Sequence, residues 1–289
     1  MTHWKIGIIG GSGLYDIDAL DHPQWIDVSS PWGSPSDALL KGSIGGVECV
    51  FLPRHGRGHK LGPSQLNYRA NIDAMKRAGV TDILSISAVG SLQEQYPPGH
   101  FVAADQFIDR TFAREKSFFG QGIVAHVSVA DPVCPRLSAM AVIAASAAGA
   151  DVTEGGCYVA MEGPQFSTRA ESALYRGWGA DIIGMTAMPE AKLAREAELP
   201  YAIIGMVTDY DCWRAEEDGV DVSDVIAVMH ANSAKAKRLV EHFVKALPAE
   251  RAPSPIDTVL DTAIITPQAD WDADLQQKAF ALLKRRLTA

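Results

Sequence analysis

Short apolar runs alternate with helix-like segments through the middle of this chain, and this alternation restricts the fold more than any other feature. The segments 80–87, 157–162, 180–185 and 200–208 are apolar and rich in β-branched residues, whereas the stretches between them are more polar. Such alternation is typical of a largely parallel sheet with helices on both faces. We therefore expect an α/β protein that binds ligands beyond the carboxyl ends of its strands.

Further strands and helices are expected on either side of this region. Apolar runs that end in glycine or proline predict strands at 4–10 and 47–53. Glycine and proline at the ends of helix-like segments mark the boundaries of the expected helices. These helices are 67–78, 135–149, 168–177, 189–198 and 221–246.

The last forty residues differ in composition from the rest. The stretch 249–272 is rich in proline, aspartate and threonine, and a short helix is expected over about 274–286. We see no boundary between two separate folds. The prediction is one domain over 1–248, with 249–289 packed on it as a C-terminal arm and helix.

The net charge of −9 restricts the partners of the chain. An acidic surface repels nucleic acid and anionic lipid, so neither is expected to bind. No run is apolar and long enough to span a membrane, and the N-terminus lacks the layout of a signal peptide. The four cysteines form neither a C-x-x-C pair nor a metal-ligand spacing, which favours reduced thiols in a cytoplasmic protein.

Two loops that follow predicted strands are suited to holding an anion. In the loop 10–13 (GGSG), glycine N–H groups and the Ser12 hydroxyl are donors. The loop 54–60 places five potentially cationic groups within seven residues, and an arginine fork suits phosphate. A metal site at His55 and His59 is disfavoured, because the glycines between them argue against a helix. A plain turn and a solvated basic loop remain open as alternatives.

The N-terminal glycines also raise the possibility of a dinucleotide-binding enzyme. The G-x-G-x-x-G pattern would require glycine at position 16, which is Asp16. Neither a G-x-x-x-x-G-K-[ST] loop nor a G-x-S-x-G nucleophile elbow is present. An NAD-dependent oxidoreductase and a non-enzymatic purine-binding module therefore stand as the rivals from other functional classes.

Polar groups follow three further strands. Ser85 and Ser87 lie on one face of the strand 80–87, the segment 161–166 (MEGPQF) ends in an aromatic residue, and Met185-Thr186 follow the strand 180–185. Each offers a hydroxyl or an apolar surface to a ligand. Ordinary packing of small and aromatic residues explains each of them equally well.

The segment 208–213 (TDYDCW) is the most informative of these motifs. Asp209 and Asp211 are two residues apart at the end of a strand, so both carboxylates point in a similar direction. Crowding of like charges raises the pKa of one of them, which favours a shared proton near neutral pH. The alternative is a solvated acidic loop, because further carboxylates follow.

Six segments, taken in order, resemble the trimeric purine nucleoside phosphorylase family: IGIIGGSGL, RHGRGHK, NYRANI, EGPQFSTRAES, GMTAMPEA and TDYDCW. The resemblance covers about residues 5–245 and is greatest to members that act on 5′-methylthioadenosine. It implies a single-domain, three-layer α/β/α fold with a mixed central sheet, assembled as a homotrimer. It also implies inorganic phosphate as co-substrate, with neither a metal nor an organic cofactor.

The resemblance also implies a role for individual residues. Phosphate-binding positions are Ser12, Arg54, His55, Ser87, Ala88 and Thr186. Nucleoside-binding positions are Phe166, Met185, Thr208, Asp209 and Asp211, and the methylthio pocket is lined by Val222, Val225 and Ile226, for which a plain core stripe is the alternative. His126 matches a residue that the family contributes across the subunit interface.

Two departures from the family pattern bear on the substrate. Methylthioadenosine-specific members commonly carry threonine where this chain has Ser12 and Ser87, and the hydroxyl group is retained. Relatives that take 6-oxopurines have asparagine in place of Asp209, so adenine is the expected base. The implied mechanism uses protonated Asp209 as general acid toward the purine N7, with Asp211 orienting the base, or the reverse. A general adenosine or 6-oxopurine nucleoside phosphorylase is the alternative.

Overall fold

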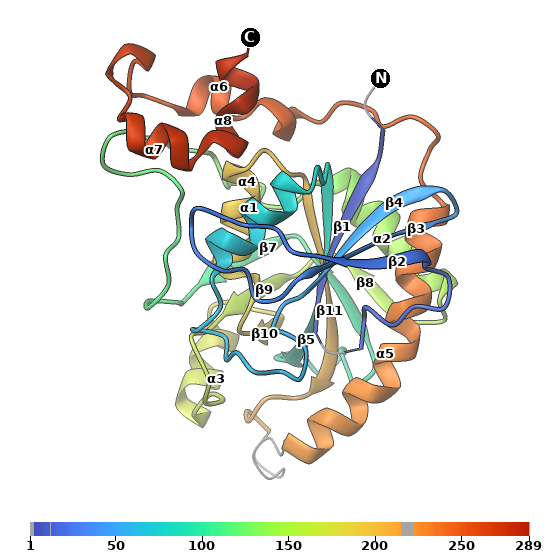
Figure 1. Cartoon of the computed structure of the whole chain (residues 1–289). Coiled ribbons are helices and arrows are strands. Elements are labelled where there is room, and N and C mark those ends of the chain that lie inside the picture. Colours follow the sequence, from blue (N-terminus) through green and yellow to red (C-terminus); the bar gives the residue numbers. More distant parts are fainter. Residues whose placement is uncertain (1–2, 12, 215–221, 289) are drawn as a thin grey trace.

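The computed structural model describes residues 3–11, 13–214 and 222–288 (Figure 1). Within this part of the chain, eleven strands form one sheet. They are β1 (Lys5–Gly10), β2 (Asp21–Ile26), β3 (Leu39–Ile44), β4 (Val47–Pro53), β5 (Asp82–Ser91), β6 (Phe101–Ala104), β7 (Gln106–Asp109), β8 (Val152–Glu154), β9 (Cys157–Ala160), β10 (Ile182–Gly184) and β11 (Tyr201–Asp209).

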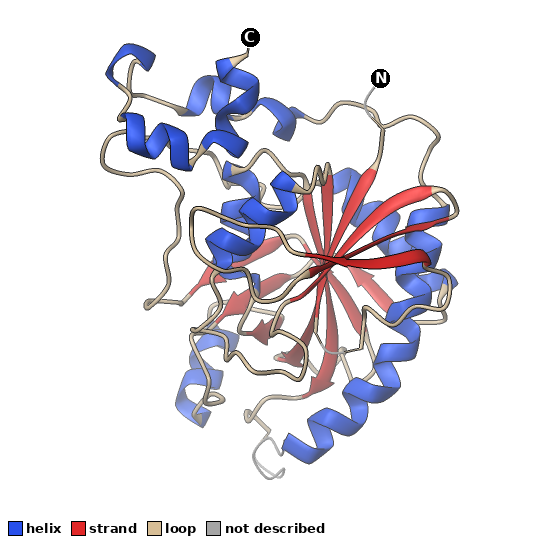
Figure 2. Ribbon diagram, viewed as in Figure 1, coloured by secondary structure: helices blue, strands red, loops and turns tan. Residues whose placement is uncertain are grey.

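Helices cover the two faces of this sheet, as Figure 2 shows by colour. They are α1 (Tyr68–Arg77), α2 (Pro135–Ala147), α3 (Arg169–Gly177), α4 (Ala187–Glu196), α5 (Val222–Lys245), α6 (Leu260–Ala263), α7 (Ala273–Lys278) and α8 (Phe280–Leu287), with 3₁₀ turns η1 (Pro255–Thr258) and η2 (Gln268–Asp270). No helix in the described ranges has the length and apolar character needed to cross a lipid bilayer.

The sheet is mixed rather than largely parallel. Strand β1 runs parallel to β4 and β5, and β11 runs parallel to β5, so the carboxyl ends of these four strands meet at one edge. Antiparallel neighbours are β2–β3, β3–β4, β10–β5 and β11–β6. Alternation of strand and helix predicted the parallel centre but not these flanking pairs, whereas the mixed three-layer α/β/α fold is confirmed.

Strict alternation along the central strands creates two separate cores. In β1, Ile9 faces the core beneath α1 and α4, whereas Ile6 and Ile8 face the core beneath α2 and α5. In β5, Ile83 faces the first core and Leu84 the second. Strands buried on both faces read as continuous apolar runs, which is why these segments stood out in the sequence.

Local signals placed most helix boundaries within two residues. The Asn67 side chain caps α1, and Thr168 and Glu171 form a reciprocal capping box at the start of α3. The expected helix 189–198 begins two residues earlier, at Ala187, and Met188 within it has an extended backbone. Pro189 therefore opens the regular part of α4, as a proline at a first helical position does.

The C-terminal segment differs in detail from the single helix expected over about 274–286. It forms two helices, α7 and α8, which are joined at Ala279. Ala279 is fully buried, and beyond it Leu282 and Leu283 enter the core that also contains α1. Burying the apolar face of α8 against that core redirects the chain, which sequence periodicity alone did not indicate.

Arg251, at the start of the C-terminal arm, forms ion pairs that join the arm to strand β5. Its guanidinium donates to the Asp82 carboxylate at the first residue of β5 and, at 2.6 and 2.8 Å, to Asp257 in η1. The side chains of Arg251 and Asp82 are only 4% and 1% exposed. Arg136 also donates to Asp82, at 2.9 Å. A buried carboxylate thus links β5, α2 and the C-terminal arm.

Arg251→Met should lower the free energy of unfolding by about 2–4 kcal/mol, because it leaves part of a buried charge without its partner. Urea denaturation at neutral pH measures this change. The matched control is Lys245→Met, which removes an exposed pair with Glu241 and should cost less than about 0.5 kcal/mol. Equal losses in the two variants would show that the arm is not anchored by Arg251.

Candidate active site

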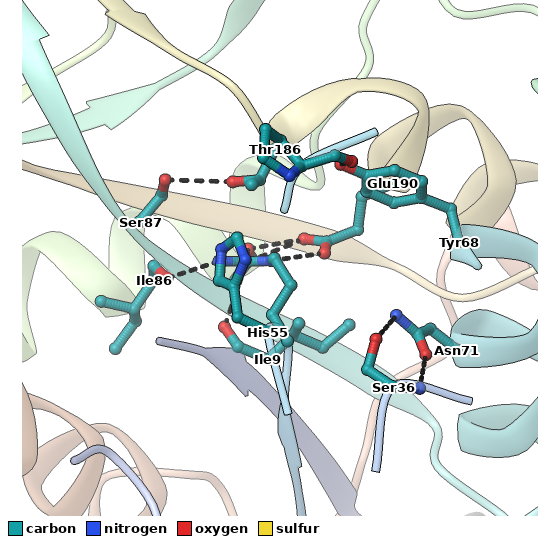
Figure 3. A network of polar contacts seen from close by, with 12 residues as sticks. Ile9, Ser36, His55, Tyr68, Asn71, Ile86, Ser87, Thr186 and Glu190 are labelled. Carbon is teal, nitrogen blue, oxygen red and sulfur yellow. Dashed lines mark hydrogen bonds and ion pairs between the residues drawn. The ribbon is translucent and has the colours of Figure 1, made fainter. Parts of the chain in front are cut away.

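A buried arginine lies at the carboxyl end of β4. Arg54 is 1% exposed, and its guanidinium pairs with Glu190 of α4 through Nε at 2.8 Å and Nη2 at 3.1 Å. Further donors reach the Ser85 hydroxyl at 2.6 Å and the carbonyl of Ile86 at 3.1 Å. Dashed lines in Figure 3 mark the contacts that the Glu190 carboxylate makes.

The carboxylate of Glu190 compensates the charge of Arg54. Burial by itself lowers the pKa of Arg54, but the negative charge and the hydrogen bonds of Glu190 outweigh it and raise the pKa above the ordinary value. Glu190 also accepts hydrogen bonds from Ser85 and from Tyr201 of β11. Arg54 is therefore fixed in place as half of an ion pair and adds little net positive charge.

Two hydroxyl groups meet beside this pair. Ser87 of β5 and Thr186, which directly precedes α4, lie 3.2 Å apart between their side-chain oxygens (Figure 3). Both residues are buried, and Ala88, next to Ser87, is partly exposed. Ser87 and Thr186 come from distant segments and lie together, as the sequence predicted. Their hydroxyl groups are uncharged hydrogen-bond donors.

His55 is held as a neutral imidazole. Its Nδ1 lies 2.8 Å from the carbonyl oxygen of Leu61, which accepts a hydrogen bond, so Nδ1 carries the proton and Nε2 is left as an acceptor. Burial and the nearby Arg54 charge lower the pKa of His55 to about 4. The His59 ring stacks on it at 4.3 Å. The basic loop therefore contributes less positive charge than its sequence indicates.

The glycine loop after β1 approaches the same region. The Arg54 N–H donates to the carbonyl of Gly10 at 2.9 Å, which ties the two loops together. A Cβ at Gly10 would lie 2.3 Å from the Leu14 side chain, so a larger residue there would displace the buried Leu14 side chain. Ser12, the expected phosphate donor of this loop, lies outside the described residues.

The aspartate pair lies at the carboxyl end of β11. Asp209 Oδ2 is 2.7 Å from the Thr208 hydroxyl, and Asp209 Oδ1 accepts from the backbone N–H of Asp211 at 2.8 Å. A Cβ at Gly90 of β5 would lie 3.0 Å from Asp209 Oδ1, so the carboxyl group sits directly over the neighbouring strand. Asp211 is 9% exposed, and its Oδ2 makes no hydrogen bond of ordinary geometry in the described structure, although the Ser172 and Ser167 hydroxyls are near enough to lower the pKa of Asp211.

Burial, more than mutual repulsion, changes the acidity of this pair. Desolvation raises the pKa of both Asp209 and Asp211, and the charge of Asp211 adds the smallest contribution at Asp209. The sequence predicted repulsion between the two carboxylates; it does raise the pKa of Asp209, but desolvation raises it more. The two carboxyl groups do not share a proton, because both oxygens of Asp209 are engaged with Thr208 and with a backbone amide.

Asp211 has a left-handed backbone, with φ of 55°. This conformation is uncommon for residues other than glycine and costs free energy that the surrounding structure must supply. It aims the Asp211 N–H back at Asp209, while the Cys212 thiol donates to the carbonyl of Ser167. The local strain thus serves to fix the geometry of the acid.

Met185 packs against Gly163, three residues before Phe166, and this contact forms an apolar wall. A Cβ at Gly163 would lie 2.5 Å from the Met185 sulfur, and Gly163 has φ of 69°, so glycine is required for this contact. Phe166 is 43% exposed and Met185 is partly exposed. An exposed aromatic side chain suits contact with a flat ring better than it suits a core position.

Sequence reasoning missed the residue that holds this wall. The Arg114 side chain is 1% exposed, and Nη1 donates to the carbonyls of Met185 at 2.6 Å and Met188 at 2.7 Å. Nη2 donates to the carbonyl of Glu162 at 2.7 Å, and Nε to its carboxylate at 3.2 Å. An arginine within a polar loop gave no periodic or motif signal. The five N–H groups of one guanidinium allow Arg114 to bind several backbone carbonyls at once.

Four residues predicted to bind the substrate are not seen to contact these polar groups. They are Val222, Val225, Ile226 and His126. At the start of α5, Val225 is partly exposed and Ile226 is 43% exposed, so the plain core stripe is not what forms there. The Val222 side chain lies outside the described part. His126 is exposed, and its N–H donates to the carbonyl of Ala263 in α6. In Figure 1 the C-terminal helices lie at the top, whereas β11 ends at the bottom.

The described residues contain neither a cluster of metal ligands nor a disulfide. No group of three or more histidine, cysteine, aspartate or glutamate side chains in this part of the chain is arranged to hold a metal ion. All four cysteines are free thiols, and three of them are buried, as expected. The functional groups that do converge are hydroxyls, a compensated arginine, a neutral imidazole and two carboxyl groups of raised pKa.

Comparison with known proteins gives a consistent result. The sequence model of the phosphorylase superfamily matches residues 5–245. S-methyl-5′-thioadenosine phosphorylase of Bradyrhizobium diazoefficiens is 55% identical over 289 residues, which is 99% of both chains.

Solved structures agree. A methylthioadenosine phosphorylase from an Antarctic soil metagenomic library has a TM-score of 0.93 at 45% identity, over 98% of this chain and 100% of that one. A variant of adenosine/methylthioadenosine phosphorylase of Schistosoma mansoni, in complex with methylthioadenosine, has a TM-score of 0.79 at 38% identity. That likeness covers 86% of this chain and 93% of the other.

The His55 imidazole should stay neutral, in the Nδ1–H form, from pH 8 down to pH 5, because its pKa is about 4 instead of 6.5. Heteronuclear NMR of imidazole-labelled protein measures the tautomer and its titration. Signals that vanish in His55→Asn identify the residue, and a histidine-containing peptide gives the ordinary titration curve. A His55 signal that titrates between pH 6 and 7 would contradict the neutral assignment.

Proposed function

The chain belongs to the phosphorylase superfamily, and we infer that it splits 5′-methylthioadenosine with inorganic phosphate, giving adenine and 5-methylthioribose 1-phosphate. The full-length identity of about 55% to proteins named for this reaction supports the substrate. The position of the Asp209 carboxyl over Gly90, three residues beyond Ser87 on the same strand, carries the inference structurally. At about 3.3 Å per residue this separation is about 10 Å, which leaves room for a ribose between phosphate and base.

Phosphate is assigned to the cluster at the carboxyl ends of β4 and β5. Its donors are the hydroxyls of Ser87 and Thr186, the backbone near Ala88 and the glycine loop with Ser12. Arg54 and His55 border this space, one as a compensated cation and the other as a neutral ring. Phosphate bound beneath the ribose would stabilise the positive charge that develops on the sugar as the glycosidic bond stretches.

The base is assigned to the cluster at the end of β11. As the bond between C1′ and N9 breaks, its electron pair moves onto the purine, and Asp209 donates a proton to N7 as general acid. A phosphate oxygen forms the new bond to C1′. The Asp211 Oδ2, which makes no hydrogen bond of ordinary geometry among the described residues, is an acceptor suited to the 6-amino group of adenine, and Phe166 and Met185 flank the ring. This chemistry requires neither a metal nor an organic cofactor.

Assembly and location are part of the same proposal. We propose a cytoplasmic homotrimer that serves purine and methionine salvage. An exposed His126 beside the C-terminal helices and a half-exposed Ile226 at the start of α5 fit a site that a neighbouring subunit completes. The methylthio group would then lie against Val222, Val225 and Ile226. Sedimentation equilibrium tests the trimer, and a monomer in solution would contradict it.

Phosphate dependence is the decisive test of the reaction. Purified protein is incubated with 5′-methylthioadenosine, with and without phosphate, and adenine and the sugar product are followed by chromatography. We expect adenine only when phosphate is present, together with a sugar 1-phosphate. Equal release without phosphate would make the protein a hydrolase. Faster turnover of inosine than of 5′-methylthioadenosine would favour a 6-oxopurine phosphorylase.

Asp209→Asn should lower kcat with 5′-methylthioadenosine by at least about 100-fold, as expected when a general acid is lost. The amide retains an oxygen for the Asp211 N–H and places an NH₂ group at the Thr208 hydroxyl, so the fold is expected to survive. Asp21→Asn, an exposed position in β2, is the matched control and should keep the wild-type rate. Normal turnover in Asp209→Asn would remove this residue from the mechanism.

A further inference from the structure

The Thr208 hydroxyl has two acceptors within reach but only one hydrogen. Its oxygen lies 2.7 Å from Asp209 Oδ2 and 3.2 Å from the carbonyl oxygen of Val89 on β5. Thr208 is 4% exposed, so solvent does not supply a substitute donor. A hydroxyl donates one hydrogen bond and accepts through its lone pairs. The two contacts can both be hydrogen bonds only if one neighbour donates, and a backbone carbonyl cannot.

The protonation state of Asp209 therefore decides which way this hydroxyl points. When Oδ2 carries a proton, that proton is donated to Thr208, and the Thr208 hydrogen goes to Val89. When Asp209 is ionised, Oδ2 accepts the Thr208 hydrogen instead. Oδ1 is unsuited to the proton, because the Asp211 N–H already donates to it at 2.8 Å. Both ends of the Asp209 carboxyl are thus assigned distinct roles.

We propose that Thr208 is a positioning residue whose hydroxyl reverses its hydrogen bond as Asp209 passes a proton to the substrate. This inference rests on the proposed phosphorolysis. Before the transfer, Thr208 accepts from Asp209 Oδ2–H and donates to the Val89 carbonyl. After it, Thr208 donates to the Oδ2 anion. At the transfer the Oδ2–H of Asp209 turns from Thr208 toward N7, and rotation about one Thr208 side-chain bond then aims its hydroxyl hydrogen at the Oδ2 anion.

The step balances without a further reactant. The O–H bond of Asp209 breaks, its electron pair stays on Oδ2, and the proton forms an N–H bond at the purine N7. The pair of the C1′–N9 bond moves onto the departing purine, and a phosphate oxygen bonds to C1′. The Thr208 O–H bond stays intact throughout. Hydrogen bonding to an anion favours it, so the new Thr208 contact stabilises the form of Asp209 that the reaction produces.

Other charged groups near Asp209 do not perform this task in the described structure. Asp211 is the carboxyl group that acts on Asp209 directly, and it disfavours the Asp209 anion. Helix α3 brings Glu171 and Tyr175 toward Asp211 rather than toward Asp209. Of the neighbouring strands, β5 contributes Val89 and Gly90 at this point, and β10 contributes Ile183. Among residues 3–11, 13–214 and 222–288, the groups that hydrogen-bond to Asp209 are thus one hydroxyl and one backbone amide, both uncharged.

The test compares Thr208→Val, which keeps the shape but removes the hydroxyl, with Thr208→Ser, which keeps the hydroxyl. The kcat and kcat/KM for 5′-methylthioadenosine are measured from pH 5 to pH 10 at saturating phosphate. We expect kcat of Thr208→Val to fall roughly tenfold, part of what a general acid supplies. Its alkaline limb should move to higher pH, since the Thr208 hydrogen bond lowers the pKa of Asp209. Thr208→Ser should stay within about threefold of wild type.

Two outcomes would overturn the proposal. One is a Thr208→Val enzyme with wild-type kcat and an unmoved alkaline limb. The other is an equal loss in Thr208→Ser and Thr208→Val, which would mark a packing role. If Thr208→Val does not fold, Thr208→Ala replaces it with the same criteria. The wild-type enzyme shows in the same experiment whether phosphorolysis occurs at all, so failure of the proposed function is recognised separately.

Discussion

The buried ion pair of Arg54 and Glu190 is the interaction on which the rest of this site depends. It joins the end of β4 to α4, and its hydrogen bonds extend to Ser85 of β5 and Tyr201 of β11. A charge buried to this degree is stable only with its partner, because desolvation of either ion alone is very costly. The pair therefore fixes how the two central strands and α4 meet at the carboxyl edge of the sheet.

Charge compensation at that pair sets the electrostatics of the whole site. With Arg54 paired and His55 neutral, the groups around the assigned phosphate position are mainly hydroxyls and amides. Such a site holds an anion through directed hydrogen bonds rather than through excess positive charge. At the other end, burial keeps Asp209 and Asp211 more basic than ordinary carboxyl groups. One end therefore suits an anionic nucleophile and the other a proton transfer.

Contacts that no sequence motif indicated lie between the assigned phosphate and base positions. Arg114 binds the carbonyls of Met185 and Glu162 and so fixes the contact between Met185 and the segment that contains Gly163. Thr208 touches both Asp209 and the neighbouring strand. Strain at Asp211, with φ of 55°, directs an amide onto the acid. These contacts join segments far apart in the sequence, and for that reason pattern analysis of single segments did not reveal them.

The sequence alone determined the α/β class, the central strands and most helix ends, because buried strands and capped helices leave local signals such as those at Asn67 and Thr168. It also marked Arg54, His55, Ser87, Thr186, Asp209 and Asp211 as chemically suited residues. Only the tertiary structure decided the antiparallel flanks of the sheet, the break at Ala279 and the charge state of the groups. Pairing, tautomer and acidity depend on neighbours and burial, and these exist only once distant segments have packed together.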